Sequence, residues 1–203
     1  MQPAIGRRVG AAAVAIVLIT GAMTVLGGGP AAAAKPLARA ELLNATGDSV
    51  GTVYFEGKGH HAEWVRVELA LPAGAPGLGA FHGLHVHTTG VCTAPLFTSA
   101  AGHWNLELGA THGGHTGDLL SPLVGPDGVA SARFETHRFD VNQLFDADGS
   151  AVVLHAGVDN FGNVPINPEN RYADPNNWYN AATGTANTGD AGGRYGCGVV
   201  QPA

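Results

Sequence analysis

Short apolar stretches of alternating polarity recur along the chain, and turn-forming residues separate them. In "VRVELALP" (65–72), valine and leucine alternate with charged or small residues. Alternate side chains of a strand point to opposite faces, so this pattern predicts a strand with one buried face. Turn stretches such as "TGDSVG" (46–51) punctuate the series, and the chain holds 31 glycines and 12 prolines. We see no amphipathic helix longer than about ten residues, and we predict an antiparallel β sandwich or barrel.

Residues 1–34 have the pattern of a secretory signal peptide. Arg7 and Arg8 precede the apolar run "VGAAAVAIVLITGAMTVLGGG", and the small residues of "PAAAAK" follow it. We expect cleavage near Ala34, secretion of the chain, and no stable membrane span after cleavage. Residues 35–203 then form one domain, whose length is ordinary for a single domain.

Charge and cysteine usage narrow the choice of partners and compartment. The formal charge is −6, and removal of Arg7 and Arg8 with the signal peptide takes it to −8. Such a protein is an improbable partner for nucleic acid. The two cysteines, Cys92 and Cys197, both lie in the exported part. An exported pair predicts one disulfide, which would close a ring of 197 − 92 = 105 residues.

Histidines gather after the signal peptide in a way that suggests a metal site. In "FHGLHVHTTGVC" (81–92), His85 and His87 are two residues apart, so on a strand both rings point to the same face. Two further segments, 88–118 and 160–193, are too long for simple hairpins, and such loops are usually functional. Strand ends and loops supply the other candidates: His103, His112, His115, Asp118, His155 and Asp159. Imidazole suits copper and zinc, and a carboxylate oxygen also suits zinc.

Six motifs resemble those of the copper-zinc superoxide dismutase family, in the family's order. They are "HGLHVH", "GHWN", "HGG", "HTGDL", "VVLHAGVD" and "TGDAGGRYGCGV", and the similarity runs from about residue 38 to residue 200. The five-residue step from His87 to Cys92 resembles the bacterial branch. The resemblance implies an eight-stranded antiparallel Greek-key barrel or sandwich with two long functional loops. It also implies that Cys92 pairs with Cys197.

The same resemblance implies a metal centre with copper and zinc. Copper would bind His85, His87, His103 and His155, and zinc would bind His103, His112, His115 and Asp118. His103 would bridge the two metals and donate a proton, and Arg194 would dock the superoxide anion. Asp159 would link ligands of the two metals, and Thr188 would lie beside the access channel. The implied reaction converts superoxide to dioxygen and hydrogen peroxide by cycling between Cu(II) and Cu(I).

Two departures from the family pattern keep alternatives open. Only two residues separate His112 from His115, which is short for the family, so a copper-only dismutase is one alternative. The stretch 161–187 holds one arginine, Arg171, and no lysine, which leaves little charge for steering the anion beyond Arg194. A non-catalytic extracellular copper-binding protein is a second alternative. The family contains monomers and homodimers, and the sequence does not choose between them.

Overall fold

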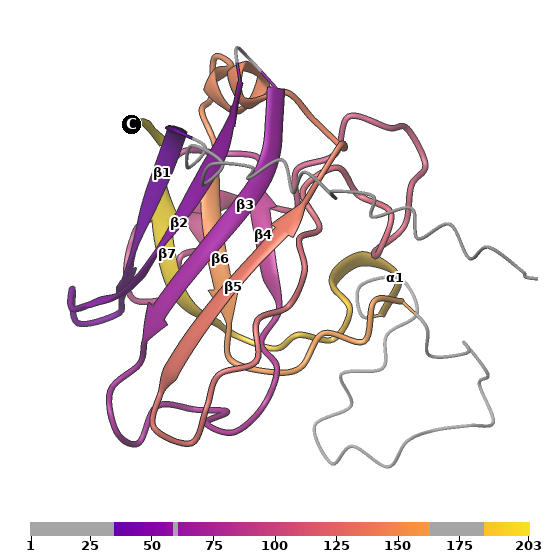
Figure 1. Cartoon of the computed structure of the whole chain (residues 1–203). Helices are drawn as coiled ribbons and strands as arrows, with labels where there is room; N and C mark the ends of the chain where they lie inside the picture. The colour runs from indigo at the N-terminus through magenta and orange to yellow at the C-terminus, as the bar shows by residue number, and fades with distance from the viewer. Residues whose placement is uncertain (1–34, 59–60, 163–184) are drawn as a thin grey trace, which may run out of the picture. The chain divides into compact units, whose positions relative to one another are not determined.

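The computed structural model describes residues 35–58, 61–162 and 185–203. Their eight strands form one antiparallel sheet in the order β4–β6–β7–β1–β2–β3–β5, with β8 paired to β1 (Figure 1). The strands are β1 (Lys35–Asn44), β2 (Ser49–Lys58), β3 (His61–Ala70), β4 (Leu84–His87), β5 (Val129–Glu135), β6 (Ala151–His155), β7 (Arg194–Val199) and β8 (Gln201–Pro202). Three short helices are η1 (Thr98–Ala100), η2 (Val141–Phe145) and α1 (Thr185–Thr188). The predicted all-β antiparallel fold is confirmed.

The sheet curls, so that its two halves face each other across a hydrophobic core. In Figure 1, β1, β2, β3 and β5 lie in front of β7, β6 and β4. After β3 the chain crosses to β4, which lies at the other edge of the sheet. It then returns to form β5, which pairs with β3, and this is a Greek-key arrangement. Across the described ranges, no helix has the length and hydrophobicity that a membrane span requires.

The alternation seen in the sequence places one face of each strand in the core. On β3, Val65, Val67 and Leu69 are buried, while the intervening Arg66 is only partly covered and Glu68 is exposed. The prediction that "VRVELALP" contributes a strand with one buried face is therefore confirmed. Phe55 of β2 lies at the centre of the same core, which continues onto β4 and β6.

Strand β6 is buried on both faces because a loop covers its outer side. Its inner residues belong to the main core, whereas Ala151 and Val153 pack in a second apolar cluster with Phe97, Ala100 and Cys197. Cys197 forms the predicted disulfide with Cys92, with the two Cα atoms 5.7 Å apart. The disulfide fastens the loop that covers β6 to strand β7.

Close approach of β1 and β7 requires a glycine. A Cβ atom built on Gly198 would lie 2.2 Å from the carbonyl oxygen of Glu41, well inside van der Waals contact. No residue with a side chain could hold this position without moving one of the two strands apart.

Candidate metal centre

Strands β4 and β6 supply three histidines from a common surface outside the main core. Along β4, Leu84 and Val86 face the core, so the alternate residues His85 and His87 face away from it. His155 ends β6, the neighbouring strand. The sequence prediction that the rings of His85 and His87 share one face of a strand is confirmed. All three rings are buried beneath the loops.

The first group of candidate ligands joins these three residues to His103. One nitrogen from each of His85, His87, His103 and His155 lies within 4.8 Å of the others. His103 comes from the loop 88–118, and a bridge pairs its backbone with that of His87. This is the set of four residues that the family resemblance implied for copper.

The other ring nitrogens of the three strand histidines have fixed partners. His87 Nδ1 donates to the carbonyl oxygen of Ala101 at 2.9 Å, and His155 Nδ1 donates to that of Gly192 at 3.0 Å. His85 Nε2 donates to Asp159 Oδ2 at 2.7 Å. These bonds fix the orientation of each ring, as outer partners of metal-binding histidines generally do.

The nitrogens that remain are buried without a hydrogen-bond partner in the described part of the chain. They are His85 Nδ1, His87 Nε2, His103 Nε2 and His155 Nε2 in the first group, and His112 Nδ1 and His115 Nδ1 nearby. Buried polar atoms without a partner are costly, and such a concentration of them favours a bound ligand. Bound metal ions would satisfy them, so the residues present fit a metal centre.

A second group forms around Asp118. His85, His103, His112 and Asp118 can bring one ligand atom each within 4.8 Å of one another. Asp118 Oδ1 lies 3.0 Å from His103 Nδ1 and 3.3 Å from His112 Nδ1. Asp118 Oδ2 lies 3.3 Å from His115 Nδ1, so His115 also reaches this carboxylate. The short spacing of His112 and His115 thus still brings both rings to Asp118.

Asp159 connects the two groups. Its Oδ2 accepts from His85 of the first group, and its Oδ1 accepts from His112 Nε2 at 2.7 Å. Gly189 lies over this contact with φ of +61°, and a Cβ atom there would lie 2.0 Å from Asp159 Oδ1. Thr188, which precedes this glycine, is the last residue of α1.

Burial keeps most of these histidines ready to bind a metal. Desolvation lowers the pKa of His87 to about 2, of His155 to about 3 and of His103 to about 4. Desolvation also lowers the pKa of His85, although Asp159 acts in the opposite direction. These four rings are therefore neutral at pH 7, which is the form that binds metals.

His112 differs because two carboxylates face it. Burial opposes its charge, but Asp118 and Asp159 outweigh that effect and raise the pKa of His112 to about 9. The pKa values of Asp118 and Asp159 lie below their usual range, since the neighbouring histidines outweigh the effect of burial. A cation in the second group would take the place of this proton.

Arg194 begins β7, and two carbonyl groups of the loop that covers β6 hold its side chain. The guanidinium donates to the carbonyl oxygen of Phe97 at 2.5 Å and also to that of Ala101. The Ala101 carbonyl also accepts from His87, so one backbone oxygen contacts both an arginine and a candidate ligand. Ala101 adopts φ of +62° and ψ of −146°, a region that residues other than glycine rarely occupy.

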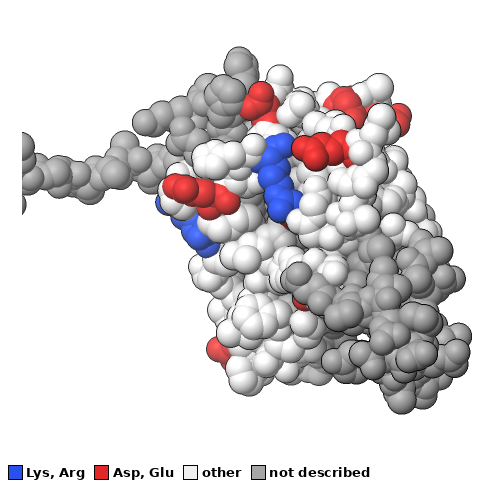
Figure 2. Space-filling model, turned by 90° about the vertical axis from the view of Figure 1, so that its right-hand side faces the viewer, with Lys and Arg blue, Asp and Glu red and all other residues white. Residues whose placement is uncertain are grey.

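One face of the described surface carries little charge. Figure 2 shows a face that is mostly neutral, with few basic side chains and acidic ones beside them. Arg171 and most of the stretch 161–187 lie outside the described residues, so the prediction about this loop stays a prediction.

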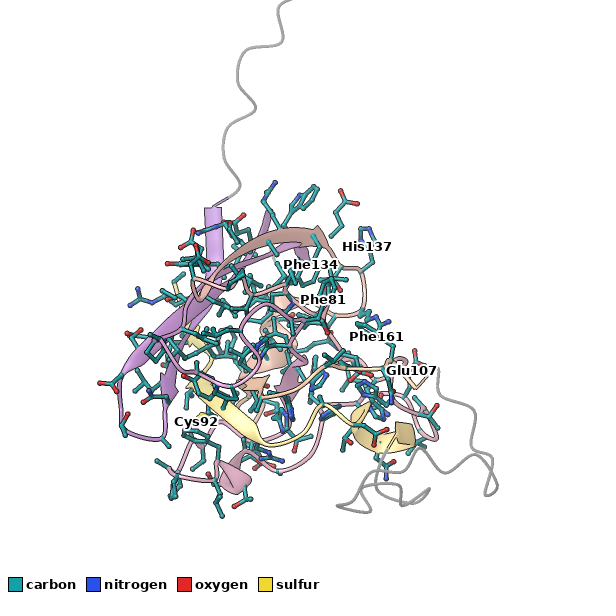
Figure 3. The ribbon with its side chains drawn as sticks, turned by 90° about the horizontal axis from the view of Figure 1, so that it is seen from below. Phe81, Cys92, Glu107, Phe134, His137 and Phe161 are labelled. Carbon is teal, nitrogen blue, oxygen red and sulfur yellow. A yellow bond between two sulfur atoms is a disulfide. The ribbon has the colours of Figure 1, made fainter. Side chains whose placement is uncertain are left out.

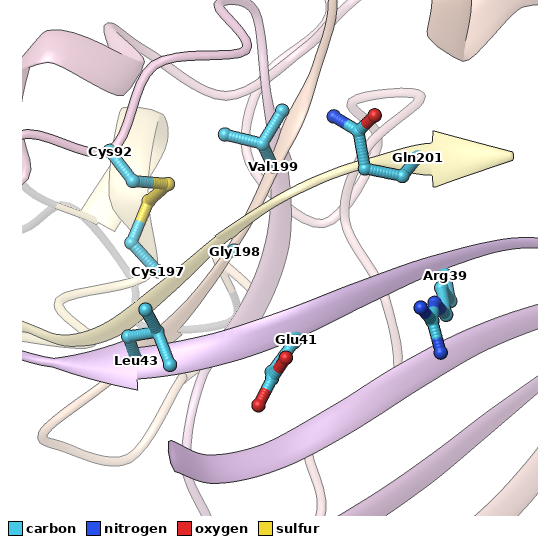
Figure 4. Close-up of a pocket in the computed structure, with 8 residues that line it drawn as sticks. All are labelled: Arg39, Glu41, Leu43, Cys92, Cys197, Gly198, Val199 and Gln201. Carbon is cyan, nitrogen blue, oxygen red and sulfur yellow. A yellow bond between two sulfur atoms is a disulfide. The ribbon is translucent and has the colours of Figure 1, made fainter. Parts of the chain in front are cut away.

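A separate groove of about 310 Å³ lies beside the disulfide (Figure 4). Arg39, Glu41 and Leu43 of β1 line it together with Cys92 and Cys197. Its lining residues include neither the histidines nor the aspartates of the two groups. The candidate metal centre is therefore not a part of this groove.

Two contacts of the site escaped the sequence analysis. The guanidinium of Arg138 donates to backbone carbonyls of the segment 113–115, and the Ala101 carbonyl supports His87 and Arg194. Both depend on chain segments that meet only in the folded protein, and neither has a local sequence pattern.

Known proteins resemble the chain in sequence and in fold. The sequence model of the family described as copper/zinc superoxide dismutase matches residues 49–200. The Cu-Zn superoxide dismutase of Mycobacterium tuberculosis is 37% identical over 164 residues, which are 76% of this chain and 65% of that relative. The one from Mycolicibacterium paratuberculosis is 34% identical over 180 residues, 84% of this chain and 76% of the relative. The structure of a SOD-like protein from Bacillus subtilis has a TM-score of 0.58 at 24% identity, and the match covers 79% of this chain and 96% of that one.

Proposed function

Because the chain belongs to the copper/zinc superoxide dismutase family, we propose that it is a superoxide dismutase that binds copper and zinc. The main support is the set of six buried imidazole nitrogens that lack a hydrogen-bond partner among the described residues. Four of them belong to the first group of ligands and two to histidines beside Asp118. Membership of the family indicates which metals these nitrogens receive.

In this proposal the first group holds copper through His85, His87, His103 and His155. When bound, copper supplies the alternating one-electron reduction and oxidation by which two superoxide anions and two protons become dioxygen and hydrogen peroxide. The low pKa values of His87, His103 and His155 support this assignment, since no proton competes for these nitrogens at pH 7.

Zinc would be held by His103, His112, His115 and Asp118. We assign His103 to both metals because its Nδ1 faces Asp118 and its Nε2 belongs with the first group. Its Nε2 would carry a proton only while it is not bound to copper, and that proton would go to the departing peroxide. Asp159 would keep the ligands of both metals oriented, since it contacts His85 and His112.

Arg194 would dock the superoxide anion. Its guanidinium is half-buried and held by two backbone carbonyls, so its charge has a fixed position. The whole chain has a formal charge of −6 and would repel an anion, so a local positive field must dominate at the site. Thr188 would line the access route from the end of α1.

We place residues 1–34 in a signal peptide and residues 35–203 in the exported enzyme. The disulfide supports export, because structural disulfides persist in oxidising compartments such as the periplasm or the extracellular space.

The test is the dismutation rate of the copper- and zinc-loaded protein, compared with a His155→Ala variant. We expect a rate near the diffusional ceiling, about 10⁸–10⁹ M⁻¹s⁻¹. A rate no higher than that of the variant would leave a non-catalytic copper-binding protein as the function. Metal analysis of the same sample distinguishes a copper-zinc from a copper-only enzyme.

A further inference from the structure

We propose that Arg138 is a positioning residue that holds the segment from His112 to His115 in the shape that binds the second metal ion. Its Nη1 donates to the carbonyl oxygen of His115 at 2.7 Å, and its Nη2 donates to that of Gly113 at 3.0 Å. The inference rests on the proposed function in one respect, namely that His103, His112, His115 and Asp118 bind a metal.

The segment needs support from outside because it has little stiffness of its own. Its two central residues, Gly113 and Gly114, are glycines, and Gly113 has φ of +85°. A Cβ atom on Gly113 would lie 2.5 Å from the carbonyl oxygen of Phe161, so no larger residue fits there. Glycine allows this tight turn but also allows many other conformations, so the ligating shape must be fixed by other groups.

One side of the segment is fixed by Asp118. Its Oδ2 accepts from the backbone N–H groups of Gly113 at 2.7 Å and His115 at 3.0 Å. Its Oδ1 faces the rings of His103 and His112, while its Oδ2 holds the backbone of the segment and also lies 3.3 Å from the ring of His115.

Arg138 fixes the other side of the same two residues. Gly113 and His115 each donate an N–H to Asp118 and each offer a carbonyl oxygen to Arg138. The backbone N–H and the backbone carbonyl of both Gly113 and His115 therefore have hydrogen-bond partners. The planar fork of an arginine can reach two carbonyls at once, which the single ammonium group of a lysine does less well.

The backbone beside Arg138 is itself anchored in the core. The next residue, Phe139, is buried and packs edge-on against Phe55 and against Trp104, with ring centroids 5.9 and 5.5 Å apart. Trp104 directly follows the shared ligand His103. The residue before Arg138, His137, lies at the periphery of the described fold in Figure 3 and is exposed. The guanidinium therefore reaches the metal-binding segment from a rigid base.

The test is a Co²⁺ titration of the full chain that already holds one equivalent of Cu(I). Cu(I) is colourless and suits the all-imidazole first group, so the visible bands of Co²⁺ report the geometry of the second group. The variants are Arg138→Ala and Arg138→Lys. Arg39→Ala removes an exposed arginine of β1 as a matched control, and His115→Ala shows the loss of a ligand.

We expect Arg138→Ala to weaken Co²⁺ binding by about 10–100-fold, as loss of an outer partner of a metal ligand generally does. It should also change the intensity of the Co²⁺ bands, while Cu(I) affinity and the melting temperature of the metal-free protein stay close to wild type. Arg138→Lys should recover part of the affinity, and Arg39→Ala should match the wild type.

Two results would overturn the inference, and they have different meanings. If the wild type binds Co²⁺ and Arg138→Ala binds it within twofold, Arg138 has no positioning role and the proposed function stands. If the wild type with its Cu(I) does not bind Co²⁺, the second metal site itself is wrong, and the inference fails together with the zinc part of the proposed function.

Discussion

Replacement of Ala101 by glycine should stabilise the protein. Ala101 has φ of +62° and ψ of −146°, and a non-glycine residue in such a region costs about 1–3 kcal/mol. Glycine removes that strain, but it raises the entropy of the unfolded chain at a cost of about 0.4–1 kcal/mol. Ala101 is exposed, so the lost methyl group adds little. The difference is a net stabilisation of about 1.3 kcal/mol, within a range of about 0–2.6 kcal/mol.

The assay is urea unfolding of the metal-free protein, because bound metals would add their own contribution to stability. With a slope of about 2 kcal/mol per molar urea, the midpoint should rise by about 0.6 M and by no more than about 1.3 M. Ala147→Gly is the matched control, since Ala147 is exposed and is not among the described residues with positive φ. That variant should lose about 0.4–1 kcal/mol. If Ala101→Gly is no more stable than Ala147→Gly, Ala101 holds no strain.

Three further predictions concern the disulfide, the close contact between β1 and β7, and Arg194. The double variant Cys92→Ser/Cys197→Ser should lose about 4–5 kcal/mol of unfolding free energy, because the disulfide closes a loop with a sequence separation of 105 residues and so limits the entropy of the unfolded chain. A loss below about 2 kcal/mol in urea unfolding would contradict this explanation. Gly198→Ala should lower the unfolding free energy by more than about 2 kcal/mol, since its Cβ would lie 2.2 Å from Glu41 O. Gly193→Ala is the control, because no described atom lies within 4 Å of its Cβ, and it should stay within about 0.5 kcal/mol of wild type. Equal midpoints of the two variants in thermal unfolding would refute this. Arg194→Gln should lower the dismutation rate by about tenfold and weaken the dependence of that rate on salt, whereas Arg194→Lys should keep the salt dependence. Stopped-flow rates at several ionic strengths would test both variants. An unchanged rate in Arg194→Gln would contradict the role of Arg194 in docking.

The strand positions of the fold and site could be predicted because their signal is local. Val65, Val67 and Leu69 alternate with polar residues, and a period of two suffices to assign a buried face. The same period placed His85 and His87 on one face of β4. The two cysteines left one possible disulfide, which formed as expected.

The loop residues could be grouped only through the family resemblance. His103, His112 and His115 lie in a loop without periodicity, and their approach to Asp118 depends on how that loop folds back. Arg138 gave no signal because its partners are 23 and 25 residues away in the chain. The strain at Ala101 was hidden because alanine is common in every kind of structure and only the backbone angles reveal it.

His103 belongs to both groups of ligands, and Asp159 contacts His85 and His112, so the two groups have no independent geometry. Under the proposed function, this makes metal uptake cooperative: an ion that orders these two side chains in one site also prepares the other site. The coupling is reciprocal, so copper must raise the affinity for zinc by the same factor by which zinc raises the affinity for copper. A chelator that removes either ion would therefore also loosen the one that stays.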